Sequence, residues 1–196
     1  MSDPVLHVLA GPNGAGKSTL YEKVIQPATG LRFVNVDVIA AQRWPGDAGD
    51  RCYEAAALAE ELRSRLMAGG MSFVTETVFS HESKIDLVRA ALDARYLVSL
   101  HVVTVPEHLA VARVASRVLA GGHSVPEDKI RQRYKRLWPL VASAIALVDA
   151  AWIYDNSSAR RPFRLVATFE RGSLVGEPAW PTWTPRALLG AATHEL

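Results

Sequence analysis

The stretch from Val5 to Leu20, VLHVLAGPNGAGKSTL, constrains the fold more than any other part of the sequence. Its apolar, β-branched run at 5–10 predicts a strand buried on both faces, and a helical pattern follows the glycine-rich turn. The turn fits the pattern G-x-x-x-x-G-K-[ST] in full. A turn that only connected strand to helix would explain the glycines but not the lysine and hydroxyl residues. The stretch therefore predicts a phosphate-binding loop, the P-loop.

The residue types of this loop indicate what it binds. Backbone N–H groups at the glycines can point at phosphate oxygens, and the helix N-terminus adds positive potential. Lys17 would reach the β- and γ-phosphates, and the Ser18 hydroxyl would bind Mg²⁺. We therefore expect ATP and Mg²⁺ as cofactors. The residues predicted to bind the nucleotide in this loop are Gly11, Pro12, Asn13, Gly14, Ala15, Gly16, Lys17, Ser18 and Thr19.

Strand and helix patterns alternate along the next part of the chain. Further strands are expected at 31–37, 71–77, 96–105 and 151–154. The expected helices are 17–26 stopped by Pro27, a short one at 38–44, 51–67 with Asp50 as N-cap, about 80–95, 107–119, and 126–138 with Pro139 bending or ending it. This alternation predicts an α/β P-loop NTPase fold of the kinase-like type, a three-layer sandwich with a mostly parallel five-stranded sheet.

After Asp155 the pattern changes. Two short strands around Arg171 and Gly172 predict a small C-terminal antiparallel hairpin, followed by a proline- and tryptophan-rich tail that should pack on the body. We interpret 1–196 as one domain, because the length suits a single core. Its α/β core would span 1–157 with a lid at about 120–137, and the hairpin and tail would span 158–196.

Composition narrows the class of protein. Apolar residues make up 49% and charged residues 21%, as in soluble globular domains. The net charge of +2 does not argue for nucleic acid or an anionic membrane as a partner. Cys52 is the single cysteine, no apolar run has the roughly 18 residues of a membrane span, and the start of the chain has no basic signal-like run. We expect a cytoplasmic protein.

Two carboxylates are expected at the carboxyl ends of neighbouring strands, Asp37 and Glu76. In an open parallel sheet this edge faces the same crevice as the P-loop. Asp37 could accept the proton of an attacking hydroxyl or hold Mg²⁺ through water, or it could only cap the helix that follows. Glu76, flanked by the hydroxyl of Thr77, could contact a polar substrate or could be a solvated strand-end carboxylate.

Arginines could supply the positive charge that phosphoryl transfer requires. Arg113 and Arg117 are four residues apart and share a helix face. Arg131 and Arg133 belong to a basic helix beyond Gly121 and Gly122. This segment could be a lid that closes over ATP, a solvated basic helix, or a small nucleic-acid patch.

The loop GPNGAGKST is similar to that of transporter-type (ABC) ATPases, and LAGGH at 119–123 resembles their LSGGQ signature. Two features depart from that family. Ala120 stands where the signature has serine, and the next apolar run ends in Asp155 and Asn156 rather than in adjacent Asp and Glu. No carboxylate is then at hand to activate water.

The chain more closely resembles the zeta-toxin family of small P-loop kinases. The resemblance rests on AGPNGAGKST, VNVDVIA with Asp37, FVTETVFS with Glu76, VPEHLAVARVASRV with Arg117, GGHSVPEDKIRQRY and the closing YDNS, which together span about residues 5–157.

The resemblance implies ATP-dependent phosphorylation of a sugar-nucleotide hydroxyl, best known for UDP-N-acetylglucosamine, within toxin–antitoxin systems. It implies that Lys17 and Arg117 bind ATP phosphates, that Asp37 is the base and that Glu76 contacts the acceptor. His123 occupies the position of a second phosphate-binding arginine, so Arg131 or Arg133 takes that role here, and YDNS with Asn156 would lie near the adenine.

We therefore predict an Mg²⁺- and ATP-dependent kinase that transfers the γ-phosphoryl group to a hydroxyl of a small molecule such as a UDP-sugar, with an antitoxin protein as a partner if it acts as a toxin. The alternatives are an ATP-binding sensor without catalysis and an ABC-like ATPase. The acceptor, the choice between ATP and GTP, and the oligomeric state stay open at this stage.

Overall fold

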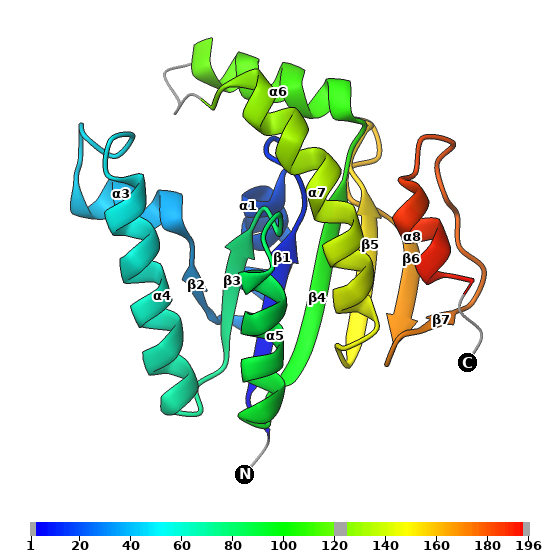
Figure 1. Ribbon diagram of the computed structural model, residues 1–196, viewed down its shortest axis with the longest axis horizontal. Coiled ribbons are helices and arrows are strands. Elements are labelled where there is room, and N and C mark those ends of the chain that lie inside the picture. The colour runs from blue at the N-terminus through cyan, green and yellow to red at the C-terminus, as the bar shows by residue number, and fades with distance from the viewer. Residues whose placement is uncertain (1–2, 120–124, 194–196) are drawn as a thin grey trace.

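One sheet of seven strands organises the molecule (Figure 1). The computed structural model describes residues 3–119 and 125–193. The strands are β1 (Val5–Ala10), β2 (Arg32–Val34), β3 (Phe73–Thr77), β4 (Leu97–Thr104), β5 (Ala150–Asp155), β6 (Arg164–Glu170) and β7 (Ser173–Val175). Their order is β2-β3-β1-β4-β5-β6-β7. All pairs from β2 to β5 are parallel, whereas β6 and β7 are antiparallel to their neighbours.

The sheet confirms the mostly parallel α/β architecture and corrects the expected count of five strands. The C-terminal hairpin is not a separate unit, because β6 pairs with β5 from Ala150 opposite Glu170 to Asp155 opposite Arg164. This pairing satisfies the backbone groups along the outer edge of β5, which would otherwise be exposed. The turn between β6 and β7 lies at Arg171 and Gly172, as expected, and both have positive φ.

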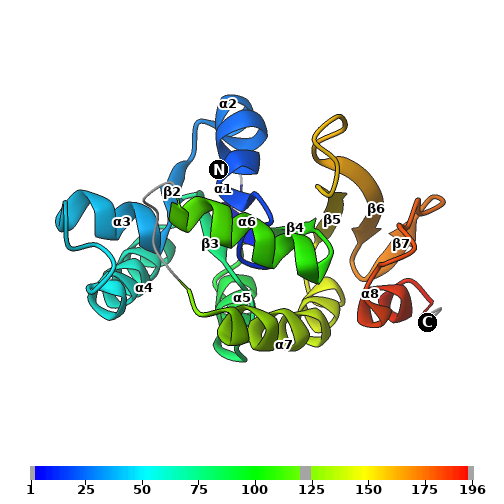
Figure 2. The same ribbon diagram turned by 90° about the horizontal axis from the view of Figure 1, so that it is seen from above.

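Helices cover both faces of the sheet (Figure 2). They are α1 (Lys17–Leu20), the π-helical η1 (Tyr21–Ile25), α2 (Gln26–Thr29), α3 (Val36–Arg43), α4 (Cys52–Ala68), α5 (Ser83–Asp93), α6 (Glu107–Leu119), α7 (Glu127–Ile145) and α8 (Arg186–Ala191). Helices α1 and α2 lie on one face, and α5 and α7 lie on the other. Helices α3 and α4 lie beside the β2 edge, and α6 crosses above the carboxyl ends of the parallel strands. Within the described ranges, no helix has the length and hydropathy needed to span a membrane.

The expected stop at Pro27 is wrong, and so is the expectation that a helix could end at Pro139. The first helical segment continues past Pro27 to Thr29, because η1 shifts the hydrogen-bonding register just before Pro27, which sits in the first turn of α2. Helix α7 continues through Pro139 to Ile145. Its buried side chains on both sides of the proline, among them Leu137 and Val141, hold the helix against the sheet.

Two expected helix starts also need correction. The N-cap of α4 is Arg51 rather than Asp50, and no side chain caps that end. Helix α5 begins at Ser83, later than the expected start near residue 80. The Gly121-Gly122 pair and the residues of LAGGH from 120 to 123 lie outside the described residues.

The core keeps the P-loop strand rigid. Leu6, Val8, Leu9 and Ala10 of β1 are fully buried between β3 and β4. Hydrophobic burial on both faces fixes the central strand. The loop that begins at Gly11 therefore starts from a rigid support at the carboxyl edge of the sheet.

Candidate active site

Two glycines of the P-loop are required by their surroundings. Gly11 has φ +145°, and a Cβ there would lie 2.3 Å from the carbonyl oxygen of Val103 on β4. Gly16 has φ +98°, and a Cβ there would lie 2.6 Å from Nδ2 of Asn156. Only glycine combines this backbone conformation with such close neighbours. The loop is thus held tightly against the ends of β4 and β5.

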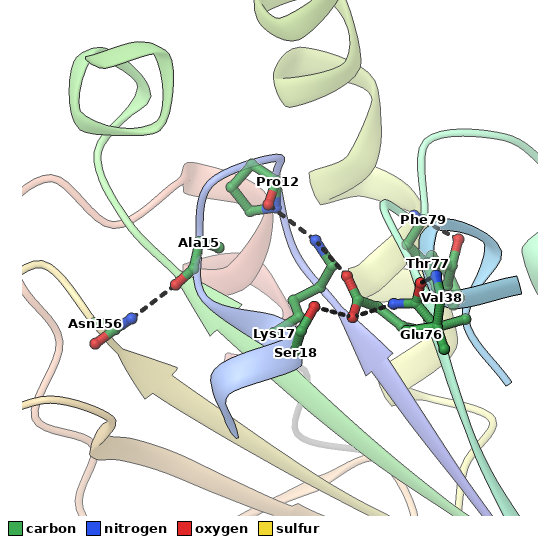
Figure 3. Close-up of polar contacts among 10 residues, drawn as sticks. Pro12, Ala15, Lys17, Ser18, Val38, Glu76, Thr77, Phe79 and Asn156 are labelled. Carbon is green, nitrogen blue, oxygen red and sulfur yellow. Dashed lines mark hydrogen bonds and ion pairs between the residues drawn. The ribbon is translucent and has the colours of Figure 1, made fainter. Parts of the chain in front are cut away.

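Lys17 points back into the loop from the start of α1 (Figure 3). Its side chain is 5% exposed, and its Nζ donates a hydrogen bond to the carbonyl oxygen of Pro12 at 3.0 Å. Nζ also lies 3.6 Å from Oε1 of Glu76. Burial lowers the pKa of Lys17, while the negative charges of Glu76 and Asp37 oppose this shift. A phosphate at this loop would therefore meet an amine held ready by the loop backbone.

Glu76, at the end of β3, joins three parts of the site. Its Oε2 accepts hydrogen bonds from Ser18 Oγ and from Asn35 Nδ2, both at 2.7 Å. Its Oε1 faces Lys17. The structure thus brings the predicted nucleotide residues and the predicted substrate residue Glu76 into direct contact (Figure 3). Oxygen groups such as those of Ser18 and Glu76 are the donors that Mg²⁺ prefers.

Asn35 is a site residue that the sequence analysis missed. Its side chain is buried, and its Oδ1 accepts a hydrogen bond from the backbone N–H of Val38 at 3.0 Å while its amide holds Glu76. Asn35 is therefore the N-cap of α3, and the interpretation of Asp37 as that cap is wrong. An asparagine just before a helix is a recognised cap signal, which could have located it.

Asp37 lies in the first turn of α3 rather than at a strand end, because β2 already ends at Val34. Its side chain is exposed toward a cleft of about 980 Å³ that also includes Lys17, Ser18 and Glu76. Asp37 also lines a neighbouring pocket of about 280 Å³ beside Ala40 and Cys52. The predicted base thus faces both the P-loop and a second space beside it.

The predicted arginines separate into two groups. Arg117 of α6 and Arg133 of α7 both line the cleft. Arg131 is exposed and pairs with Glu127 and Glu107, with its Nη1 3.1 Å from Oε1 of Glu107. Of the two lid candidates, Arg133 therefore lines the cleft and Arg131 does not. The described residues of the expected lid, 125–137, lead without interruption into the part of α7 whose side chains are buried.

Asn156 holds the P-loop through a side-chain hydrogen bond to its backbone. Its Nδ2 donates to the carbonyl oxygen of Ala15 at 2.8 Å, and it is not among the residues that line the cleft. Arg113, which the sequence analysis named only for its helix face, donates to the carbonyl oxygens of Asn156 at 2.9 Å and of Gly14 at 3.5 Å. These bonds tie α6 and β5 to the P-loop. A direct contact of Asn156 with adenine stays a prediction.

Thr77, the remaining predicted substrate residue, lines the cleft at the end of β3. Its Oγ1 accepts a hydrogen bond from the backbone N–H of Phe79 at 3.0 Å, and Phe79 has φ +62°. The Thr77 hydroxyl therefore stabilises the turn that carries the chain from β3 toward α5. Its hydrogen can still be donated to a group in the cleft.

Comparisons with known proteins agree with the fold. A family model described as an AAA domain matches residues 6–140. No curated protein sequence gives a significant match. The AvrRxo1-ORF1:-ORF2 complex with ATP matches with a TM-score of 0.69 at 18% identity, over 89% of this chain and 61% of that chain. This chain therefore spans less than two thirds of that relative.

Two further solved structures share the fold. The PezAT chromosomal toxin–antitoxin system of Streptococcus pneumoniae matches with a TM-score of 0.66 at 16% identity, over 86% of this chain and 72% of that chain. A protein of Chloroflexus aurantiacus J-10-fl, proposed to be a kinase, matches with a TM-score of 0.56 at 17% identity, over 69% of this chain and 80% of that chain. At such identities the likeness shows a P-loop kinase-like fold.

Proposed function

The chain belongs to the AAA domain family, and we propose that it is an Mg²⁺- and ATP-dependent kinase that phosphorylates a hydroxyl of a small molecule. The observation that carries the proposal is the position of Asp37, which faces the one cleft shared by the P-loop and the end of β3. A base in that position lies between a bound nucleotide and an acceptor. Hydrolysis would not need the part of the cleft beyond the P-loop.

In the proposed reaction the P-loop holds the phosphates of ATP. Lys17, Arg117 and Arg133 compensate the negative charge that moves from the γ-phosphoryl group to ADP. The acceptor oxygen forms a bond to the γ-phosphorus as the bond from that phosphorus to the β-bridging oxygen breaks. Asp37 accepts the hydroxyl proton and later releases it to water. Holding both reactants in line in one cleft supplies much of the acceleration.

Mg²⁺, when bound, neutralises the phosphate charge and orients the β- and γ-phosphates. The Ser18 hydroxyl would be its protein ligand, and Asp37 would hold it through water. Among the described residues, no three His, Cys, Asp or Glu side chains form a metal site of their own. This donor set suits an ion that keeps several waters and binds together with nucleotide phosphates.

For the acceptor we propose a UDP-sugar such as UDP-N-acetylglucosamine, with Glu76 and Thr77 on its side of the cleft. The resemblance of the sequence motifs to zeta toxins supports this choice, and so does the fold shared with a toxin–antitoxin system. On the same grounds we propose an antitoxin protein as a partner.

The experiment follows the γ-phosphate of labelled ATP. The purified protein would be incubated with Mg²⁺ and γ-labelled ATP, with UDP-sugars, nucleosides or a small-molecule cell extract as acceptors, and the label would be traced by chromatography. We expect label in an organic phosphate, and on a UDP-sugar if the finer proposal holds. Label only in free phosphate would indicate an ATPase, and ATP bound without any turnover would indicate a sensor.

A further inference from the structure

The acceptor end of the cleft contains a buried arginine that the proposed reaction does not use. Arg63 of α4 is 6% exposed and lines the same cleft as the P-loop. Helix α4 lies beside the β2 edge of the sheet (Figures 1 and 2). Arg63 therefore meets the cleft from a different helix than Arg117 of α6 and Arg133 of α7.

The hydrogen bonds of Arg63 are incomplete. Its Nη2 donates to Oε2 of Glu60, and its Nη1 has only a long contact of 3.5 Å to Oγ1 of Thr75. Its Nε is buried and has no hydrogen-bond partner in the structure. An unpartnered charged donor in a buried position is costly, and native proteins retain one mainly where a ligand or water completes its bonds. The guanidinium is thus poised to accept an anion.

Lys84 adds a second positive charge at this end of the cleft. It lies in the first turn of α5, is partly buried and lines the cleft. Burial lowers its pKa, and the charge of Arg63 lowers it further. In the described part of the chain, Lys84 makes no ion pair within 4.0 Å. The two cations therefore face the same space and repel each other.

The nearby acid does not neutralise this pair. Glu60 is exposed and is engaged with Arg63, and its charge only partly offsets the effect of Arg63 on Lys84. His81, the other titratable side chain of the β3–α5 segment on the cleft, is exposed and contacts Ser83. Two cations with one solvated carboxylate leave a net positive subsite. Arginine binds carboxylate and phosphate groups through two parallel hydrogen bonds, and lysine binds phosphate as a point charge.

We propose that Arg63 and Lys84 form an anion-binding subsite that selects acceptors carrying a carboxylate or phosphate group. This proposal rests on the proposed kinase function for the identity of the ligand as the acceptor. The anionic group of the acceptor would complete the hydrogen bonds of Arg63 and reduce the repulsion between Arg63 and Lys84. The acceptor hydroxyl would then be directed toward Asp37, on the P-loop side of the cleft.

The direct test measures anion binding without requiring turnover. The protein would be saturated with Mg²⁺ and ADP to fill the P-loop and then titrated with inorganic phosphate or, in a parallel arm, with glycolate. The readout is the ¹⁵N–¹H signal of the Arg63 Nε, assigned with Arg63→Lys. We expect the signal to shift in a saturable way as the anion binds. The affinity for the anion obtained from this titration should be at least about fivefold lower in Lys84→Gln than in the wild type. The anion that binds more tightly, phosphate or glycolate, indicates whether the subsite prefers a phosphate or a carboxylate group.

A matched control is Arg65→Gln, because Arg65 lies on the same helix but is exposed and paired with Glu61. It should bind the anions like the wild type. No saturable shift in either arm, or equal affinity in Lys84→Gln, would overturn the subsite.

A turnover arm separates this proposal from the kinase proposal. Acceptors would be offered in pairs, N-acetylglucosamine with its 1-phosphate and glucose with gluconate, and labelled products compared. We expect the anionic member of a pair to be preferred and Lys84→Gln to raise its KM by about tenfold, with the KM for ATP unchanged. Anion binding at Arg63 without any labelled product would support the subsite and contradict the kinase. Transfer to neutral acceptors with equal efficiency would support the kinase and contradict the subsite.

Discussion

The P-loop, which would hold the phosphates of ATP, is one continuous segment, residues 11–19, whereas the proposed acceptor end of the cleft draws its side chains from α4, β3 and α5. In the P-loop the glycine backbone itself would be the binding surface, and it is tied to β4, β5 and α6 by close contacts and hydrogen bonds. At the acceptor end, Arg63 and Lys84 come from separate helices. The comparison suggests that a substitution in the first region should affect every acceptor equally, while one in the second should change which acceptor is used.

The largest effect is expected for Lys17→Met, which keeps the length of the side chain and removes its charge. Loss of a buried cation directed at the transferring phosphate should reduce the rate of transfer by about 10³-fold or more with every acceptor. Steady-state kinetics with two acceptors would measure this, with a thermal melt to confirm folding. A loss confined to one acceptor would contradict the division of the cleft into two ends.

Gly16→Ala tests how tightly the P-loop is held. The new Cβ would meet Nδ2 of Asn156 at 2.6 Å in a backbone conformation that alanine avoids. We expect unfolding to become easier by about 1–3 kcal/mol and ATP affinity to fall. Gly30→Ala is the matched control, because Gly30 also has positive φ but its Cβ would meet nothing within 4 Å.

The double variant Gly16→Ala with Asn156→Ala separates the two causes. Removing the amide relieves the clash but not the backbone strain, so part of the stability lost in Gly16→Ala should return. Urea denaturation would measure the coupling free energy. Strictly additive effects would show that the contact seen between the two residues is unimportant.

A smaller effect should separate the two lid arginines. Arg133→Gln is expected to lower kcat/KM for ATP by about 10–100-fold, because Arg133 lines the cleft. Arg131→Gln should change it by less than about threefold, since Arg131 forms exposed ion pairs with Glu107 and Glu127. The reverse order of effects would assign the phosphate contact to Arg131.

The effect expected to be smallest near neutral pH concerns the sheet, away from both ends of the cleft. His101 is packed between His7, Trp152 and Tyr154, and burial lowers its pKa to about 3, helped by the charge of His7. In the unfolded chain its pKa returns to about 6.5, so the unfolded state binds more protons between pH 6.5 and 3. Stability should therefore fall as the pH drops below about 6.5, by up to about 1.4 kcal/mol per pH unit.

Urea denaturation of His101→Gln and the wild type at several pH values would measure this slope. The variant should be less sensitive to acid, whereas His81→Gln, at an exposed position, should behave like the wild type. Equal slopes in His101→Gln and the wild type would contradict the assignment.

The two ends of the cleft also differ in how far the sequence predicts them. The P-loop was predictable because its residues are adjacent and glycine, lysine and serine each have a fixed role at fixed spacing. The parallel strands were predictable from their apolar runs, although the place of β6 on the edge of β5 was not, because edge pairing depends on the folded sheet. Asn35 was not predicted because the sequence offers Asp37 two residues later, which can also be a site residue or the cap of the following helix.

Arg63 could not be predicted as a site residue. In the sequence it is one of several charged residues of an ordinary helix, with Glu60 and Arg65 close by. Only tertiary packing buries it while Arg65 stays exposed. The proposed subsite therefore depends on contacts between helices, and local sequence patterns do not report these contacts.

The most direct test of the central claim is the fate of labelled γ-phosphate in Asp37→Asn under single-turnover conditions. The variant keeps the shape of the side chain but removes the base. The account predicts that Asp37→Asn binds Mg²⁺-ATP with the wild-type affinity within about threefold, while transfer to the acceptor falls by about 10²–10⁴-fold. Transfer at the wild-type rate would contradict the role of Asp37 and the placement of the acceptor beside it.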